Sequence, residues 1–123
     1  MKIRSIVCID ALELTEEETP RDQAGKKLLL RELIKCHTGF SAVRNETVAT
    51  GAWGCGAFGG DKEVKFAIQL AAASQAGVKC LRYSFFVSQF TIKMISIKYN
   101  GRHGFPDTHT RKSRVVHCIC AGN

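Results

Sequence analysis

The pattern of apolar and polar residues in the first third of the chain predicts a strand followed by a helix. Residues 4–10 form a short stretch rich in Ile and Val, which is typical of a buried strand. Thr19 and Pro20 favour the start of a helix, and the apolar residues that follow recur on one helix face. We expect this helix to end at Gly39, because glycine commonly terminates helices.

A second helix is predicted between a glycine-rich segment and a strand. Asp61 is suited to cap its first turn, and Gly77 is suited to the left-handed conformation that ends many helices. Between them, apolar residues recur at helical spacing on one face: Val64, Ala67, Ile68, Ala71 and Ala72. Residues 78–86 have the composition of a strand, and residues 90–99 that of a strand or hairpin. The order of elements indicates an α/β fold.

The composition is typical of a folded domain, but the charge is unevenly distributed. Apolar residues make up 45% of the chain and charged residues 24%, with a net charge of +7. Residues 62–123 hold 10 Lys and Arg against 2 Asp and Glu. A basic half can bind an anionic partner. Since these residues are scattered, a solvated basic face or an unstructured tail is the simpler interpretation.

Membrane, export and metal signals are weak in this sequence. Apolar runs fall short of the roughly 20 residues that a spanning helix needs, so we expect no membrane partner. The apolar run that ends at Asp10 is too short for a signal peptide, so we expect a nuclear or cytoplasmic protein with free thiols. The run from His117 to Cys120 supplies only half of a metal site, so we predict no metal and no cofactor.

The segment with chemical content is the glycine-rich loop, residues 51–60. Glycines let backbone N–H groups approach a diphosphate, and the positive end of the following helix dipole adds to the attraction. Gly54, Gly56 and Gly59 have the spacing of a dinucleotide-binding fingerprint, but the expected acid about 20 residues later is missing. The alternative is a turn without a ligand, in which Trp53 and Phe58 pack in the core.

Residues 50–61 closely resemble the signature loop of the poly(ADP-ribose) glycohydrolases. The stretch reads Thr-Gly-Ala-Trp-Gly-Cys-Gly-Ala-Phe-Gly-Gly-Asp, and the family has Asn where this chain has Ala52. Neighbouring segments resemble the strands and helices of that family as well: residues 6–12, 30–40, 65–73 and 83–85. The resemblance therefore covers about residues 5–85.

The resemblance implies a fold and a division of the chain. Residues 1–86 are expected to be part of a catalytic domain with a macrodomain-like, three-layer α/β fold, in which helices flank a mixed sheet. Residues 87–123 no longer resemble the family, and we expect them to form a divergent, irregular basic tail.

The resemblance also implies an activity, the hydrolysis of ribose–ribose O-glycosidic bonds in poly(ADP-ribose). Main-chain N–H groups of the glycine-rich loop would contact the diphosphate, at Gly54, Cys55, Gly56 and Ala57. Phe58 would position the distal ribose, and Phe85 would pack on the adenine. The alternative for Phe85 is an ordinary core aromatic.

The family's catalytic elements, a Gly-Gly-Gly stretch followed by Gln-Glu-Glu, are missing from these 123 residues, so we assign no catalytic residue. The acidic run of residues 16–18 lacks the glycines, and we interpret it as solvated. We therefore expect binding without turnover from this chain alone. The expected partners are poly(ADP-ribose), ADP-ribose and poly(ADP-ribosyl)ated proteins in the DNA damage response, without sequence-specific nucleic acid. The alternatives are a non-catalytic module that binds ADP-ribose or nucleotide phosphates, and an inactive fragment.

Overall fold

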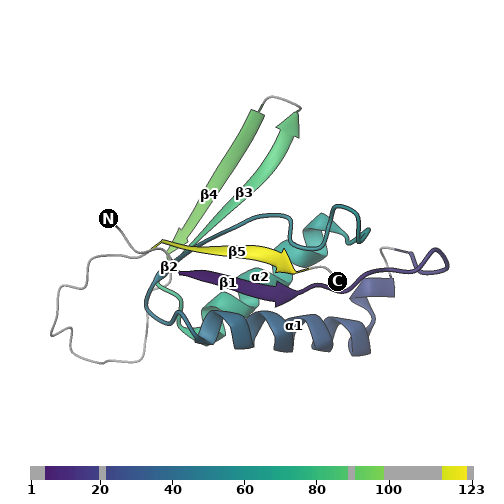
Figure 1. The fold of residues 1–123 in the computed structure, drawn as a ribbon, viewed down its shortest axis with the longest axis horizontal. Helices are drawn as coiled ribbons and strands as arrows, with labels where there is room; N and C mark the ends of the chain where they lie inside the picture. The colour runs from purple at the N-terminus through teal and green to yellow at the C-terminus, as the bar shows by residue number, and fades with distance from the viewer. Residues whose placement is uncertain (1–4, 20–21, 89–90, 99–114, 122–123) are drawn as a thin grey trace, which may run out of the picture.

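The computed structural model describes residues 5–19, 22–88, 91–98 and 115–121 (Figure 1). These residues form a five-stranded mixed sheet in the order β1-β5-β2-β3-β4. β1, β5, β2 and β3 are mutually parallel neighbours, while β4 runs antiparallel to β3. The strands are β1 (Ile6–Asp10), β2 (Thr47–Thr50), β3 (Cys80–Ser88), β4 (Thr91–Lys98) and β5 (Val115–Ala121). The predicted α/β class and mixed sheet are confirmed.

Two helices, α1 (Lys26–Ser41) and α2 (Lys62–Ala76), pack against each other on one face of this sheet (Figure 1). The core lies between these two layers, where Ile9, Val48 and Leu81 from the sheet meet side chains of both helices. The β3–β4 hairpin extends away from the rest of the molecule in Figure 1, because only the first half of β3 pairs with β2. None of the helices among the described residues is long and apolar enough to cross a membrane.

The first helix differs from its prediction at both ends. A short 3₁₀ helix, η1 (Asp22–Ala24), precedes α1, and Thr19 donates hydrogen bonds to the carboxylate of Asp22 instead of capping an α-helix. At the other end Gly39 lies inside α1, which continues to Ser41. A Cβ on Gly39 would lie 2.7 Å from Cδ1 of Ile9, so this glycine permits close packing of helix on strand instead of ending the helix.

The first strand is less buried than its apolar composition suggested. Ile9 is buried in β1, but Ile6 is 59% exposed. β1 forms the edge of the sheet, and the described helices cover only the face that carries Ile9. The short strand β2, which the apolar pattern did not identify, lies between β5 and β3.

The second helix has the predicted ends but a different buried face. The Asp61 carboxylate accepts a hydrogen bond from the Val64 N–H, and Gly77 has a φ of 75°. Ala67 and Ala71, which were predicted on the inner face, are exposed. The buried residues of α2 include two polar ones and are Lys65, Ile68, Gln69, Ala72, Ala73 and Ala76.

The segment after residue 86 is regular wherever the structure describes it, in contrast to the irregular tail that we expected. β4 confirms the strand or hairpin predicted for residues 90–99, and β5 occupies the position between β1 and β2. Two parallel strands that are joined by a helix need not be neighbours in the sheet. A strand from the end of the chain can therefore lie between β1 and β2, which α1 connects. The proposed boundary at residue 86 falls within β3.

Candidate functional site

The glycine-rich loop lies at the carboxyl end of β2 and leads directly into the N-terminus of α2. In open sheets of parallel strands, ligands bind beyond the carboxyl ends of the strands. The first N–H groups of a helix also attract anions. The topology therefore places the loop where a phosphate-bearing ligand is expected.

The loop folds back on itself through short-range hydrogen bonds. The Cys55 N–H donates to the Ala52 carbonyl at 3.1 Å, and the Gly60 N–H donates to the Gly54 carbonyl at 3.0 Å. Gly54 and Gly59 have φ values of 70° and 71°, in the left-handed region that favours glycine. A Cβ on Gly60 would lie 2.5 Å from the Gly54 carbonyl oxygen, so these glycines allow the loop to close.

The candidate diphosphate residues differ in what their backbone offers a ligand. The N–H group of Cys55 is used within the loop, and Gly54 is buried. Gly56 and Ala57 are exposed, and within the described part of the chain their N–H groups and that of Phe58 donate no hydrogen bond. The outer turn of the loop thus presents three consecutive backbone donors.

A cavity of about 400 Å³ lies beside the loop, at the first turn of α2 and against the hairpin. Phe85 lines this cavity and is only partly buried, so it is not an ordinary core aromatic. The other lining residues are mostly apolar and come from the loop, α2, β3 and β4: Ala52, Lys62, Glu63, Phe66, Tyr83 and Ile95.

Tyr83 lines the cavity together with Ala52 of the loop. Its ring packs edge-to-face on Phe66, with 4.8 Å between the ring centroids. Burial of the hydroxyl, with a smaller contribution from the nearby Cys55 thiol, raises the pKa of Tyr83 to about 12. Tyr83 therefore stays neutral to well above the physiological pH range.

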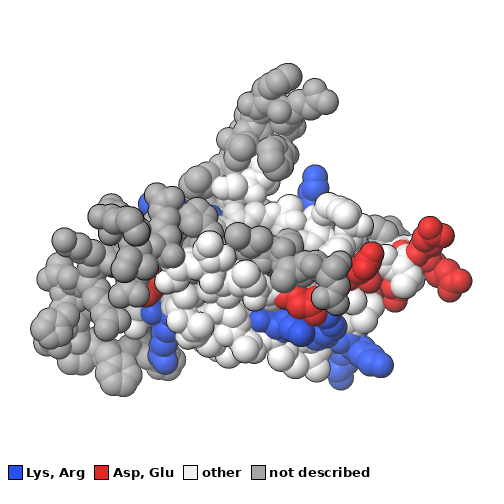
Figure 2. Space-filling view, in the orientation of Figure 1, with Lys and Arg blue, Asp and Glu red and all other residues white. Residues whose placement is uncertain are grey.

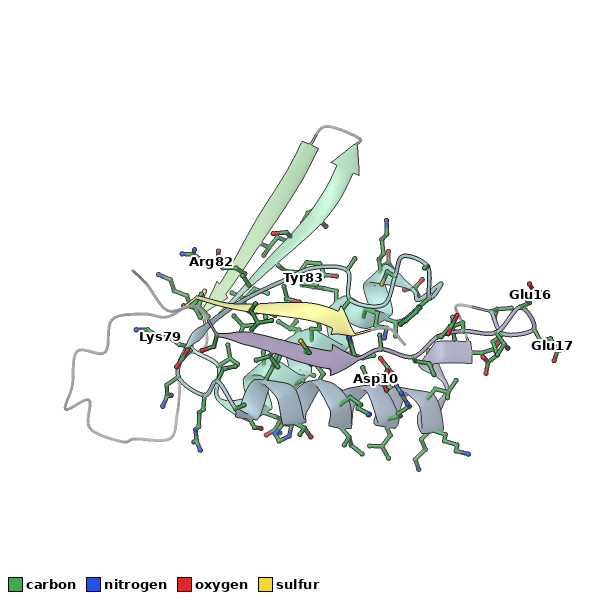
Figure 3. All side chains as sticks on the ribbon, viewed as in Figure 1. Asp10, Glu16, Glu17, Lys79, Arg82 and Tyr83 are labelled. Carbon is green, nitrogen blue, oxygen red and sulfur yellow. The ribbon has the colours of Figure 1, made fainter. Side chains whose placement is uncertain are left out.

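Phe58 and the acidic run lie near each other, but their side chains face different surroundings. The Phe58 carbonyl accepts a hydrogen bond from the Leu14 N–H at 3.0 Å, and the Phe58 side chain packs against the core. Glu16 and Glu17 are exposed and point away from the body of the molecule in Figure 3. Acidic side chains gather at this end of the molecule in Figure 2, as expected for a solvated run.

Three polar residues that support the loop were missed by sequence reasoning. Gln69 receives a hydrogen bond from the Thr50 hydroxyl at 2.6 Å and donates to the Gly51 carbonyl at 2.9 Å. Lys65 and Glu32 form a fully buried ion pair. The available signal was the spacing of Asp61, Lys65 and Gln69, which puts three polar groups on one face of α2.

The residues considered as metal ligands in the sequence lie in β5. Among the described residues, no group of three or more His, Cys, Asp or Glu side chains is arranged to hold a metal ion. The backbone of His117 and Cys120 lies in β5, but the side chains of this strand fall outside the described part of the structure. Cys8 and Cys80 carry free thiols.

Comparison of the sequence with known proteins finds one family. Residues 1–92 match the model of the family described as poly(ADP-ribose) glycohydrolase (PARG), macro domain fold. Poly(ADP-ribose) glycohydrolase 1 of Caenorhabditis elegans is 38% identical over 76 residues, which are 57% of this chain and 10% of that protein.

Two Arabidopsis thaliana proteins match shorter segments with higher identity. Probable poly(ADP-ribose) glycohydrolase 2 is 56% identical over 36 residues, which are 29% of this chain and 7% of that protein. Poly(ADP-ribose) glycohydrolase 1 is 64% identical over 31 residues, 25% of this chain and 6% of that protein. The chain therefore spans a tenth or less of the length of these curated relatives.

Proposed function

Because this chain belongs to the poly(ADP-ribose) glycohydrolase family, we propose that it contributes the ADP-ribose-binding part of a site that hydrolyses ribose–ribose O-glycosidic bonds in poly(ADP-ribose). The observation that carries the proposal is the outer turn of the glycine-rich loop. There the N–H groups of Gly56, Ala57 and Phe58 donate no hydrogen bond to the described residues, and the loop leads directly into the N-terminus of α2. Consecutive backbone donors at a helix N-terminus suit a diphosphate.

The remaining parts of ADP-ribose are assigned to neighbouring groups. Gly54 and Cys55 shape the loop that faces the diphosphate, and Phe58 positions the distal ribose. The cavity lined by Phe85 takes the adenine, because its apolar walls suit a flat base and stacking on an aromatic ring contributes about 1–3 kcal/mol per base. Ala52 at the cavity rim provides no side-chain hydrogen bond, where the family has Asn.

The proposal includes binding but no turnover by this chain alone. Glycoside hydrolysis requires a carboxyl group that protonates the leaving oxygen and assists the attack of water. The 123 residues contain neither a Gly-Gly-Gly stretch nor a Gln-Glu-Glu stretch. Hydrolysis therefore depends on groups outside this sequence. Poly(ADP-ribosyl)ated proteins as partners, a nuclear or cytoplasmic location and a role in the DNA damage response remain predictions.

Calorimetry with ADP-ribose and two site variants tests the binding proposal. A Cβ on Gly56 would meet nothing within 4 Å, so Gly56→Val changes the outer turn without disturbing the core. We expect this variant to lose saturable binding and Phe85→Ala to weaken binding about tenfold or more. Leu30→Ala is the control, because Leu30 is exposed on α1 and does not line the cavity. If both site variants bind ADP-ribose as tightly as the parent chain and added salt abolishes the binding, the interaction is due to charge alone and the proposed site is wrong.

A non-catalytic binding module is the second candidate function, and the missing glutamate stretch favours it. Both candidates predict that this chain alone binds ADP-ribose and releases none from the polymer, so the experiment tests this shared prediction. The purified chain is incubated with poly(ADP-ribose), and free ADP-ribose is quantified by chromatography. We expect no release above the protein-free control. Efficient release would refute the binding-only role and the claim that the chain lacks its own acid.

A further inference from the structure

A buried ion pair lies against the inner side of the glycine-rich loop. The Nζ atom of Lys65 in α2 donates to Oε2 of Glu32 in α1, and both side chains are fully buried. The other carboxylate oxygen of Glu32 accepts a hydrogen bond from the Leu12 N–H at 3.0 Å and one from Arg31. The pair thus joins α1, α2 and the segment that follows β1.

Lys65 also contacts the loop directly. Its Nζ lies 3.9 Å from the centroid of the Trp53 ring, and the indole N–H of Trp53 donates to the Ile9 carbonyl at 3.0 Å. A Cβ on Gly54 would lie 3.1 Å from Nζ, and a Cβ on Gly60 would lie 3.2 Å from Cε of Lys65. The lysine therefore fills the space between the two ends of the closed loop.

Stability alone does not account for such a pair. Removing two charges from water is costly, and well-packed apolar residues often replace a buried ion pair without loss of stability. An ion pair differs from apolar packing in being directional. Here it fixes the ammonium against the face of Trp53, where a cation interacts favourably with the ring.

We propose that Lys65 and Glu32 are positioning residues for the glycine-rich loop. Their ion pair holds the ammonium against Trp53 and the loop backbone, and this arrangement keeps the loop in the conformation in which the N–H groups of Gly56 and Ala57 donate no hydrogen bond to the described residues. That the oriented groups serve a diphosphate rests on the proposed function. The effect of the pair on the conformation of the loop does not.

The chain contains its own reporter for this proposal, because Trp53 is its single tryptophan. The double variant Lys65→Met/Glu32→Gln removes both charges and leaves no unpaired buried ion. In this variant we expect a cooperative melting transition together with a shifted Trp53 emission maximum and changed amide NMR shifts for residues 54–60. ADP-ribose affinity is expected to fall about tenfold or more.

Two further variants keep the test decisive. Lys79→Met is the matched control, because Lys79 is exposed at the opposite end of the sheet from the loop (Figure 3). It is expected to leave Trp53 emission and ADP-ribose affinity unchanged. Glu32→Asp serves if the double variant does not fold, because it keeps both charges and shortens the carboxylate side chain, which changes the position of the Lys65 ammonium without leaving an unpaired buried ion.

The outcomes separate this proposal from the proposed function. A folded variant with native Trp53 emission, native loop amide shifts and affinity within twofold of the parent overturns the positioning role. If the parent chain does not bind ADP-ribose, the proposed function fails. Trp53 emission and the loop amide shifts then still decide whether the ion pair positions the loop.

Discussion

Gly54 and Gly56 lie two residues apart in the glycine-rich loop, but their surroundings differ. Gly54 is buried with a φ of 70°, and a Cβ there would lie 2.9 Å from the Cβ of Ala11. Gly56 is exposed and has open space around the same position. At the scale of the residue, the fold requires a glycine at position 54, whereas position 56 has room for a side chain.

The two glycines therefore respond differently to alanine. Gly54→Ala forces a side chain into the left-handed region and against Ala11, so we expect it to lower the free energy of unfolding by about 1–3 kcal/mol. Gly56→Ala is the control and should change it by less than about 0.5 kcal/mol. Urea denaturation followed by circular dichroism measures both values. Equal destabilisation by the two substitutions would contradict the described loop conformation.

Tyr83 makes the stability of the chain depend on alkaline pH. Its pKa is raised from 10.0 to about 12 by burial, so the folded state disfavours the phenolate. The stabilising contribution of the neutral hydroxyl is complete below pH 10 and is lost as the pH rises toward 12. We expect Tyr83→Phe to flatten this part of the stability profile, measured by denaturation at several pH values. A variant that loses stability as steeply as the parent would show that another group titrates there.

Helix α2 supports the loop at the scale of the element, through polar groups spaced four residues apart. Asp61 caps the first turn, Lys65 reaches Trp53 and Glu32, and Gln69 bonds the residues where the loop begins. The same face carries Ile68 and Ala72 into the core. One helix surface therefore both packs the sheet and orients the loop.

The cap of α2 is open to a direct test. Asp61→Ala removes the acceptor for the Val64 N–H, and losing an N-cap typically costs about 1 kcal/mol. We expect a reduction of about that size in the free energy of unfolding, measured in urea. Ser74→Ala, at an exposed position late in the same helix, is the control and should have little effect. A loss of equal size in both variants would show that it does not arise from the cap, because alanine has a higher helix propensity than serine at position 74.

The sequence predicted the elements around the loop better than their buried faces. The caps at Asp61 and Gly77 depend on local chemistry, so they could be identified without tertiary information. The burial of Lys65 could not, because it depends on Glu32, which lies 33 positions away. Likewise Gly39 appeared to be a helix end, since its contact with Ile9 becomes visible only when α1 packs on β1.

The candidate site shows the same division between local and tertiary information. Phe85 and the loop were proposed from sequence. They line the same cavity because the chain returns through α2 into β3, which pairs with β2 and so brings Phe85 close to the loop. Which N–H groups are left without a partner inside the loop depends on the turn at Cys55, where the N–H donates to the Ala52 carbonyl. Hydrogen bonding inside a loop has no simple sequence signature, so the candidates Gly54 and Cys55 could not be told apart from Gly56.

At the scale of the whole molecule, the last described strand holds the sheet together. β5 pairs with β1 on one side and β2 on the other, so the two halves of the parallel sheet meet only through it. Without β5, β1 would have no strand partner and β2 would present an open edge, which favours aggregation. The stability of the chain therefore depends on a segment outside the family match to residues 1–92.

Truncation tests this dependence. A chain that ends at residue 98 retains β1 to β4 but lacks β5, and we expect it to lose the cooperative melting transition and to elute as aggregates in gel filtration. A chain that ends at residue 121 keeps the whole of β5 and is the control. If the shorter chain melts cooperatively at the temperature of the control, β5 contributes nothing to stability. The glycine-rich loop would then be supported by β2, β3 and the two helices alone.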